Sequence, residues 1–372
     1  MKLDTWLGAE LKNQKTKNLF RELRNPSGLI DFCSNDYLGL ARSETLYERV
    51  YHRCQNLDVK MNGATGSRLL SGNSRLIEEV ETKLASIFES EAALVLNSGY
   101  TANLAIFSSL PQRNDTILYD ELAHASIKDG ARLSLAKRFR FRHNDLNDLE
   151  SRLKKASGNI YVAVESVYSM DGDECPLTEL VALTTKYGAF LVLDEAHSTG
   201  IRGSNGSGMA TSFGLQKNID IRLFTFGKGM GVHGACIAGS RNLIEYIINF
   251  ARPFVYTTAL TPHSVIAIDC AFDYLKENLH LQSDLAMNIK TFLEGISDLP
   301  NRTESSSAIQ TVIVAGNRSV REASAKLQEQ NFDIRPIVSP TVPAGSERLR
   351  ICLHTYNTSD EITKLTEELK KL

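Results

Sequence analysis

The stretch IDIRLFTFGKGMG at residues 219–231 decides the fold, because a β-branched and aromatic run passes directly into a glycine-rich turn that holds one lysine. The composition of the run predicts a buried strand. Gly227, Gly229 and Gly231 remove side chains around Lys228, as expected where a bulky group approaches the backbone. Taken alone, such a turn is more typical of an exposed surface lysine, so the meaning of Lys228 depends on its surroundings.

Parts of this region match the sequence patterns of nucleotide-binding motifs, but the neighbouring residues and predicted elements do not meet the requirements of those motifs. Gly229, Gly231 and Gly234 fit GxGxxG, yet residues 235–239 predict a second strand where the dinucleotide motif requires a helix. A phosphate-binding P-loop needs Ser or Thr after its Gly-Lys pair, and Gly229 stands there instead. DEAH at 194–197 also occurs in helicases, which need a P-loop and a basic surface. These functions are therefore disfavoured.

The composition and charge disfavour a protein that binds nucleic acid or an anionic membrane surface. The 372 residues are enough for about two domains, and 42 basic against 44 acidic residues give a net charge of -2. This balance lacks the basic footprint of a nucleic-acid or anionic-membrane binder. We expect the partners to be small molecules or a second copy of the chain.

Cysteine usage and hydropathy predict a cytoplasmic protein without a metal site or a membrane span. No CxxC pair or Cys/His cluster at metal-ligand spacing occurs, and no apolar run approaches the length of a transmembrane helix. The scattered pattern suits a reducing compartment. The six cysteines are Cys33, Cys54, Cys175, Cys236, Cys270 and Cys352.

Helical and strand-like segments alternate from residue 74 to 240, which predicts an α/β architecture with a mostly parallel sheet. The expected strands are Ala93–Leu96, Thr116–Tyr119, Arg138–Phe141, Ile160–Glu165, Phe190–Asp194, Ile219–Phe226 and Cys236–Gly239.

The rest of the chain predicts two further parts. We expect an N-terminal arm at 1–40 that packs on the main body, a large domain at 41–255 and a smaller C-terminal α+β domain at 256–372. The C-terminal part is expected to contain helices at 261–278, 284–296 and 319–330, strands at 309–314 and 348–353, and a closing helix.

Asp194 turns Lys228 into a candidate cofactor anchor. It ends the apolar run Phe190–Asp194, and in open α/β sheets ligands bind at the carboxyl ends of strands. A lysine and an aspartate at neighbouring strand ends suggest pyridoxal 5'-phosphate, which needs a lysine for its aldehyde and a carboxylate on its pyridine nitrogen. Alone, Asp194 would serve equally well as a helix N-cap.

Other strand ends supply groups that fit the same cofactor. A helical pattern begins at Gly99, and its free amides could hold a phosphate. His124 follows another strand and could stack on the pyridine ring, while Ser169 and Asp171 could bond the ring oxygen. Each residue alone is ambiguous, but together they predict a pyridoxal-phosphate site.

A set of ordered motifs gives the chain a clear family likeness. They are SNDYLGL at 34–40, GATGSRLLSGN at 63–73, NSGYTAN at 97–103, HAS at 124–126, YSMDGD at 168–173, DEAHSTG at 194–200, TFGKG at 225–229 and TVPAGSERLR at 341–350. With these motifs the chain resembles the α-oxoamine synthases over essentially its whole length. These are pyridoxal-phosphate acyltransferases of the aspartate aminotransferase fold (fold type I) that condense an amino acid with an acyl thioester and release carbon dioxide.

The resemblance implies a role for each matched residue. Lys228 would carry the cofactor, His124 would stack on its ring and Asp194 would hold its nitrogen, which makes these three the implied catalytic residues. The further implied cofactor contacts are Gly99, Tyr100, Ser169, His197 and Thr225. Thr257 or Thr258 would reach the phosphate bound to the other subunit, which implies a homodimer with shared active sites.

The substrates follow from the same resemblance. Arg350 would bind the amino-acid carboxylate, since a guanidinium fork suits a planar carboxylate. The other implied substrate contacts are Arg21, Asn35, His124 and Thr341. The likeness is strongest to members that join L-alanine to a pimeloyl thioester, carried by coenzyme A or a carrier protein, on the way to biotin.

Other activities within the family share the same cofactor residues. Glycine C-acetyltransferase, 5-aminolevulinate synthase and serine palmitoyltransferase differ in the substrate pocket, and residues 334–343, which border the acyl channel, depart from the usual family pattern. A non-catalytic subunit that has lost its lysine is disfavoured, because Lys228, Asp194 and His124 are all present.

Overall fold

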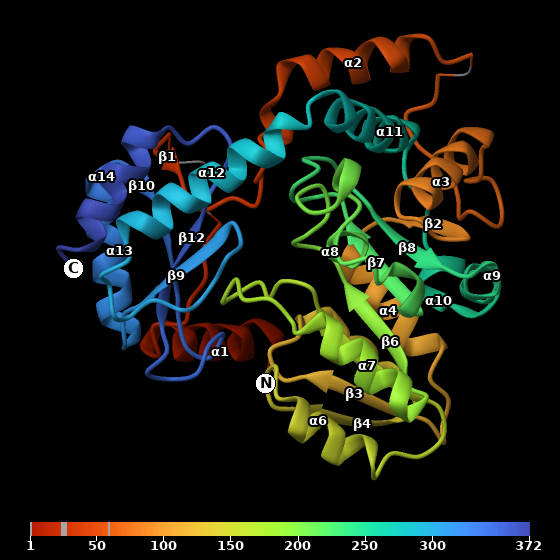
Figure 1. Cartoon of the computed structure of the whole chain (residues 1–372), viewed down its shortest axis with the longest axis horizontal. Coiled ribbons are helices and arrows are strands. Elements are labelled where there is room, and N and C mark those ends of the chain that lie inside the picture. Colours follow the sequence, from red (N-terminus) through yellow and green to blue (C-terminus); the bar gives the residue numbers. More distant parts are fainter. Residues whose placement is uncertain (1, 24–27, 59) are drawn as a thin grey trace.

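A seven-stranded sheet carries the strands between residues 92 and 239 in the computed structural model, which describes residues 2–23, 28–58 and 60–372 (Figure 1). Five neighbouring strands run parallel, and the reversed strand β8 lies between β7 and β2. The spatial order is β2 (Ala92–Leu96), β8 (Ala235–Gly239), β7 (Ile221–Thr225), β6 (Phe190–Asp194), β5 (Ile160–Glu165), β3 (Thr116–Asp120) and β4 (Lys137–Phe141).

Both faces of this sheet are packed against helices. On β6, Leu191 and Leu193 belong to one buried apolar cluster and Val192 to a second, because successive side chains of a strand point to opposite faces. The helices of this lobe are α2 (Glu44–Gln55), α3 (Arg75–Ile87), α4 (Gly99–Ser109), α5 (Ala125–Leu133), α6 (Leu146–Leu153), α7 (Leu177–Tyr187), α8 (Met209–Ser212), α9 (Arg241–Phe250) and α10 (Arg252–Val255). Short 3₁₀ turns occupy Leu40–Arg42, Ser204–Gly206 and Gln216–Asn218.

The C-terminal lobe is built on two small sheets. One is antiparallel, in the order β11 (Arg335–Ile337), β12 (Arg348–Cys352) and β9 (Ile309–Ile313). In the other, β1 (Ile30–Asp31) pairs in parallel with β10 (Phe332–Asp333). The accompanying helices are α12 (His280–Gly295), α13 (Asn317–Glu329) and α14 (Ser359–Leu369). The remaining long helix, α11 (Pro262–Glu277), contacts α2 and α3 of the larger lobe.

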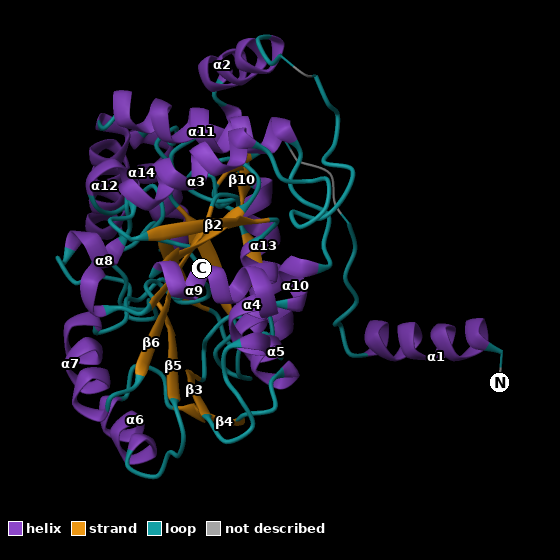
Figure 2. Ribbon diagram, turned by 90° about the vertical axis from the view of Figure 1, so that its right-hand side faces the viewer, coloured by secondary structure: helices purple, strands orange, loops and turns teal. Residues whose placement is uncertain are grey.

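The N-terminal arm divides into two parts with different surroundings. Its first helix, α1 (Leu3–Thr16), has no buried residue and extends away from the body (Figure 2). By contrast, Phe32 and Tyr37 are fully buried. The expectation that the whole arm packs on the main body is therefore wrong for α1, whose apolar side chains find no core to enter, and correct for the segment after β1.

Most expected elements are present with shifts at their ends. The strand expected at Ile219–Phe226 is shorter, Ile221–Thr225, because a 3₁₀ turn precedes it and the turn that holds Lys228 follows it. The helix expected at 284–296 begins earlier, at His280. The divisions at residues 40 and 255 stay a prediction.

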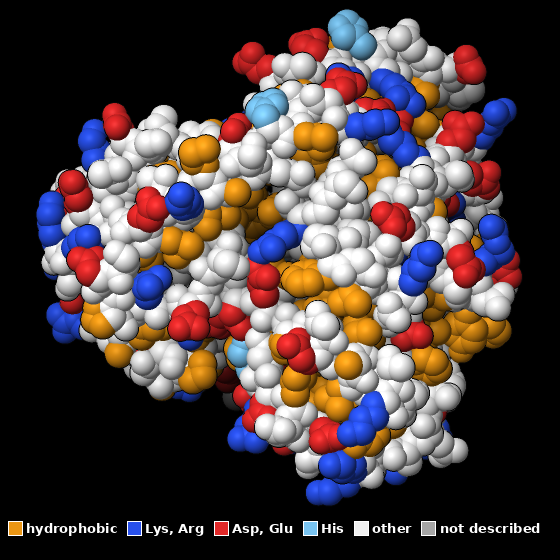
Figure 3. Space-filling view, viewed as in Figure 1, with side chains coloured by type: hydrophobic (Ala, Val, Ile, Leu, Met, Phe, Trp, Pro, Cys, Tyr) orange, Lys and Arg blue, Asp and Glu red, His pale blue; other side chains and the backbone are white. Residues whose placement is uncertain are grey.

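The surface in Figure 3 is hollowed between the two lobes. Acidic and basic side chains are interspersed over this face, without a continuous basic patch. Among the described residues, none of the helices has both the length and the apolar character needed to cross a membrane.

Candidate active site

A cavity of about 230 Å³ opens where the carboxyl ends of β2, β3, β5, β6 and β7 meet. This edge is where open α/β sheets bind their ligands. Seven of the predicted site residues lie in its wall: Asn35, Gly99, Tyr100, His124, Asp194, Thr225 and Lys228. Strands far apart in the sequence thus bring the central predicted residues together.

Lys228 lies in the turn between β7 and β8, and hairpin hydrogen bonds set its position. Val232 N donates to Phe226 O at 2.9 Å, and Gly231 N donates to Lys228 O at 2.8 Å. Gly231 has a φ of +64°, and a Cβ there would overlap Ala41 N. The glycines of the motif therefore close a tight turn that presents the lysine to the cavity.

The surroundings of Lys228 favour a neutral amine. Burial lowers the pKa of Lys228, against the opposing effect of the Asp194 and Glu165 carboxylates. Arg350 adds to the lowering through its positive charge. A neutral amine is the form that can attack an aldehyde or remove a proton.

Asp194 is fixed by two donors. Asn103 Nδ2 donates to its Oδ2 at 2.8 Å, and Ala196 N donates to its Oδ1 at 3.0 Å. Asn103 itself is buried on α4 and also donates to Ser126 Oγ at 3.0 Å. Its Oδ1 is a buried oxygen with no hydrogen-bond partner among the described residues. The side-chain amide of Asn103 therefore connects helix α4 to the Asp194 carboxylate and to Ser126 at the start of α5.

His124 is held at the start of α5 in a defined tautomer. Its Nδ1 accepts from Ser126 N at 3.2 Å, so the proton of the neutral ring lies on Nε2. Burial lowers the pKa of His124, which favours that neutral ring. An uncharged, oriented imidazole suits the stacking role that we expected.

Glu165 is a second carboxylate of the cavity wall. It lies opposite Asp194 in the register of β5 and β6, is 2% exposed, and accepts a hydrogen bond from His124 N at 2.5 Å. Burial, followed by the charge of Asp194, raises the pKa of Glu165 to about 8. Glu165 therefore positions the backbone of His124.

The start of α4 forms a cradle for an anion. Ser98 caps the helix by accepting from Thr101 N at 3.2 Å, and Ser98, Gly99 and Tyr100 at the helix start line the cavity. A Cβ on Gly99 would overlap Thr225 Cγ2, so only glycine lets the helix start approach β7 this closely. Free amides and the helix dipole favour a phosphate at this point.

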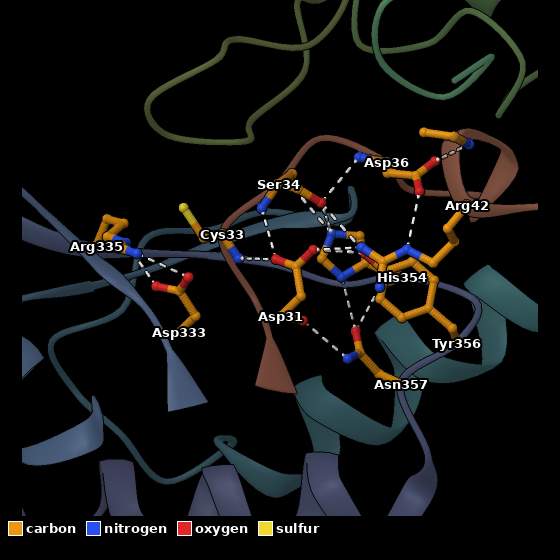
Figure 4. Close-up of polar contacts among 11 residues, drawn as sticks. Asp31, Cys33, Ser34, Asp36, Arg42, Asp333, Arg335, His354, Tyr356 and Asn357 are labelled. Atoms are coloured by element: carbon orange, nitrogen blue, oxygen red, sulfur yellow. Dashed lines mark hydrogen bonds and ion pairs between the residues drawn. The ribbon is translucent and has the colours of Figure 1, made fainter. Parts of the chain in front are cut away.

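Asn35 lies in the cavity wall, between Ser34 and Asp36. Figure 4 shows how the neighbouring residues Asp31 and Ser34 are fastened to the loop after β12. Asp31 accepts from Ser34 N at 2.9 Å and from the Tyr356 hydroxyl at 2.9 Å. Asn357 Nδ2 donates to Asp31 O at 3.0 Å. These bonds tie the arm to the C-terminal lobe and hold Asn35 against the cavity.

Arg350 and Ser169 lie behind the wall rather than in it. Arg350 Nη2 donates to Asn35 Oδ1 at 3.0 Å, and its Nε donates to Ser169 O at 2.7 Å. Arg350 is 9% exposed. The guanidinium thus reaches the cavity through Asn35.

Three other predicted residues are not brought into this cavity within one protomer. His197 is buried, with Nδ1 2.8 Å from the Tyr37 hydroxyl. Thr257 borders a separate small hollow beside Asn97, and Thr258 is exposed, with its carbonyl accepting from Asn97 Nδ2 at 2.9 Å.

Arg21 and Thr341 line a second, larger cavity of about 1070 Å³ between the arm and the C-terminal lobe. Its walls combine apolar groups with cations. They include Leu19, Phe20, Ile337 and Val338 together with Arg321 and Arg335. The predicted substrate residues are therefore divided between two cavities.

The comparisons with known proteins decide the family. Residues 27–369 match the profile of the family described as "Aminotransferase class I and II". The chain belongs to this family, in its α-oxoamine synthase branch. It is 38% identical to 8-amino-7-oxononanoate synthase of Emericella nidulans, over 92% of this chain and 89% of the relative. For 8-amino-7-oxononanoate synthase of Geotalea daltonii, the identity is 37% over 96% and 95%.

Solved structures agree with this placement. Serine palmitoyltransferase from S. paucimobilis, with bound PLP, has a TM-score of 0.89 at 27% identity, covering 100% of this chain and 98% of that one. The 8-amino-7-oxononanoate synthase from Francisella tularensis has a TM-score of 0.80 at 30% identity, covering 92% and 97%. The predicted family, fold type, pyridoxal-phosphate dependence and acyltransferase class are confirmed.

Four residues of the site were not predicted from the sequence as functional residues. Asn103, Ser126 and Glu165 lie in the cavity wall, and Tyr37 bonds to His197 behind it. A signal existed for Glu165, which is the one charged residue of an otherwise apolar strand, and a weaker one for Asn103, which lies among apolar residues in the middle of α4. Tyr37 carries no such signal, because a tyrosine is ordinary in a core. Among the described residues, no group of His, Cys, Asp and Glu forms a metal site.

Proposed function

We propose that this enzyme joins L-alanine to a pimeloyl thioester, with loss of carbon dioxide, to form 8-amino-7-oxononanoate for biotin synthesis in the cytoplasm. The observation that carries the proposal is the 37–38% identity to relatives of that name over more than nine-tenths of this chain. The two cavities agree with it, since one suits the cofactor and the other suits an apolar chain that ends in a carboxylate.

The residues of the smaller cavity fit pyridoxal 5'-phosphate. Gly99 lets the start of α4 pack closely on Thr225, and Ser98, Gly99 and Tyr100 line the cavity at that helix start, where we place the phosphate. Asp194, held by Asn103, supplies a carboxylate for the pyridine nitrogen. His124 supplies a neutral ring for stacking, and Lys228 supplies the amine.

When bound, the cofactor supplies a conjugated ring that accepts the electron pair left on the α-carbon of the amino acid. Lys228, with its lowered pKa, removes the α-proton and later returns a proton to the product. Asp194 keeps a negative charge beside the ring, and Arg350 binds the substrate carboxylate with Asn35. Asn35 Oδ1 is occupied by Arg350 and Tyr37, so its amide N–H groups are the ones left to donate to that carboxylate.

The larger cavity supports a pimeloyl rather than a palmitoyl chain. Leu19, Phe20 and Val338 offer apolar walls, while Arg21 and Arg321 add positive charge. A pimeloyl group ends in a carboxylate that would pair with these cations, whereas a palmitoyl chain ends in a methyl group. Arg21 and Thr341 are the proposed contacts.

We also propose a homodimer with shared active sites. Thr257 and Thr258 lie outside the cavity of their own protomer, as expected if they complete the phosphate site of a second copy. Light scattering of the purified protein tests the dimer. A cofactor site that assembles in a strict monomer would refute the shared site.

Serine palmitoyltransferase is the second candidate, favoured by the higher TM-score of 0.89 against 0.80. The test combines L-alanine, glycine or L-serine with pimeloyl, acetyl, succinyl or palmitoyl thioesters, on coenzyme A and on a carrier protein, and follows thiol release. We expect preference for L-alanine with pimeloyl. Preference for L-serine with palmitoyl, unaffected by Arg21→Ala, would overturn the assignment.

A further inference from the structure

Glu165 and Asp194 are two buried carboxylates side by side in the wall of the smaller cavity. They face each other in the register of the adjacent parallel strands β5 and β6, and the two residues are 2% and 5% exposed. Burial removes the water that would stabilise each negative charge, and two neighbouring negative charges also repel each other. We therefore expect one of the two carboxylates to hold a proton.

The hydrogen-bond donors indicate which carboxylate keeps its charge. Asp194 accepts at both oxygens, from Asn103 Nδ2 at 2.8 Å and from Ala196 N at 3.0 Å. Glu165 accepts at Oε1 from His124 N, and among the described residues no group donates to its Oε2. Because donated hydrogen bonds favour the charged form of a carboxylate, Asp194 is the better anion. Glu165 Oε2 is the oxygen left to carry the proton.

The positive charges near Glu165 do not replace that proton. Lys128 on α5 donates from its Nζ to Glu121 O at 2.7 Å, so its hydrogen bond goes to another group. Lys228 lines the same cavity, where burial lowers its pKa and favours the neutral amine. Neither lysine is therefore a fixed counter-ion for Glu165.

The other titratable groups around Glu165 also leave it protonated near neutral pH. Burial, followed by the charge of Asp194, raises the pKa of Glu165 to about 8, and Asp120 at the end of β3 adds to the rise. The charge of Lys228 opposes the rise without cancelling it. Tyr168 is a neutral phenol, since burial raises its pKa well above the usual value. An ordinary glutamate, with a pKa of about 4.3, would be ionised at this pH.

We propose that Glu165 is a positioning residue that holds a proton on Oε2 and thereby keeps Lys228 in its neutral form. An ionised Glu165 would favour the ammonium form of Lys228, because opposite charges attract. With the proton in place, Glu165 and Asp194 together carry one negative charge beside a neutral amine. The consequence for turnover rests on the proposed role of Lys228, whereas the proton on Glu165 does not.

Infrared spectroscopy of the full-length, cofactor-free protein can detect this proton directly. Labelling the glutamate side-chain carboxyl carbons with ¹³C separates their bands from those of aspartate, and Glu165→Gln assigns the band of Glu165. At about pH 6.5 we expect a carboxylic-acid carbonyl band that disappears as the pH rises through about 8. If the wild type has no such band beyond those of Glu165→Gln, the inference is wrong.

Asp194→Asn tests the shared charge with Glu165 left in place. The asparagine keeps the shape of the side chain but removes the neighbouring negative charge. Glu165 should then lose its proton at a pH about one unit lower than in the wild type. A midpoint that stays where it was would contradict the pairing of the two carboxylates.

The effect on Lys228 is read from cofactor binding, because only a neutral amine can attack the aldehyde. We expect the ratio of the wild-type to the Glu165→Gln dissociation constant for pyridoxal phosphate to rise about tenfold between about pH 7 and 9. Glutamine cannot ionise, so this ratio removes the effect of pH on the cofactor itself. A ratio that does not change with pH would exclude the action of Glu165 on Lys228.

Glu150→Gln is the matched control. Glu150 lies on α6, where it accepts hydrogen bonds from Lys186 Nζ at 2.6 Å and from the Tyr187 hydroxyl at 2.8 Å. This variant should leave the carboxylic-acid band and the pH dependence of cofactor binding unchanged. If the wild type does not bind pyridoxal phosphate, the proposed function fails, while the infrared spectrum still decides whether Glu165 holds a proton.

Discussion

The contact between Gly99 and Thr225 predicts a pair of substitutions that should harm the cofactor site singly and compensate together. A Cβ on Gly99 would overlap Thr225 Cγ2, while the next nearest atoms, Thr225 Cβ and Leu223 Cδ2, lie at 3.6 and 3.7 Å. Backbone conformation is no obstacle to alanine, because Gly99 is not in the left-handed region. The effect of Gly99→Ala therefore comes from one methyl group meeting another.

The size of the effect can be worked out from this overlap. The start of α4 must retreat from β7 by about 1 Å to restore ordinary contact. Overpacking of this kind costs about 1–3 kcal/mol of stability, and a misplacement of about 1 Å at a binding site can cost about 100-fold in activity. We expect Gly99→Ala to weaken pyridoxal-phosphate binding by about 10-fold or more, because the amides that hold the phosphate move with the helix.

Thr225→Ser removes Cγ2 and keeps the hydroxyl, so the double variant should recover most of the lost affinity. The assay is titration of the cofactor-free proteins with pyridoxal phosphate, followed by absorbance, alongside urea unfolding. A double-mutant cycle should give a coupling of about 1–2 kcal/mol. The reasoning is refuted if Gly99→Ala binds the cofactor normally, or if the losses in the two single variants simply add.

Three further predictions test individual residues. Lys228→Ala should abolish borohydride-reducible attachment of the cofactor and all turnover, and thiol release at the wild-type rate would contradict its role. Asp194→Asn should keep bound cofactor, seen by absorbance, but lose activity about 100-fold or more, because a neutral amide no longer stabilises a protonated pyridine nitrogen; an unchanged rate would contradict this. His143 is half-buried, which opposes its charged form, but hydrogen bonds to Asp120 and Asp173 outweigh this and raise the pKa of His143 to about 9. Because the folded-state pKa is raised, this stabilisation is full below about pH 6.5 and is lost as the pH rises through about 9. The difference in unfolding free energy between wild type and His143→Gln should therefore shrink by about 2 kcal/mol over that range, and a difference that does not change with pH would exclude the charged pairing.

The sheet and its ligand edge were predictable because strand periodicity is local. Phe190–Asp194 reads as a buried strand from five consecutive residues, and the acid at its end needs no further information to be placed at the carboxyl edge. The turn at Lys228 was predictable for the same reason, because the glycines on both sides of the lysine indicate where the turn lies and that it is tight.

The supporting residues were harder to predict because their partners come from distant parts of the chain. Asn103 faces Asp194 across 91 residues, and Tyr37 faces His197 across 160. The residue type alone does not predict either hydrogen bond, because asparagine and tyrosine occur in many protein cores. Glu165 stands between these cases, because a carboxylate at the end of a buried strand is unusual, but its acceptance of the His124 amide depends on the neighbouring strand.

The same distinction explains why the chemistry of this enzyme is better determined than its substrate. Asp194 and Glu165 are placed by the hydrogen-bond register of adjacent strands, so a shift of one residue would move the whole strand. Lys228 is placed by the tight turn that joins the paired strands β7 and β8. Arg21 and Thr341 lie on the arm and on a loop, outside any strand register, and their cavity is shaped by α1, β11 and α13 together. Because α1 has no buried residue in the protomer, its contribution to that cavity depends on what packs against it. Substitutions at Arg21 should therefore change the choice of acyl thioester while leaving cofactor binding intact, which separates the two halves of the proposed reaction.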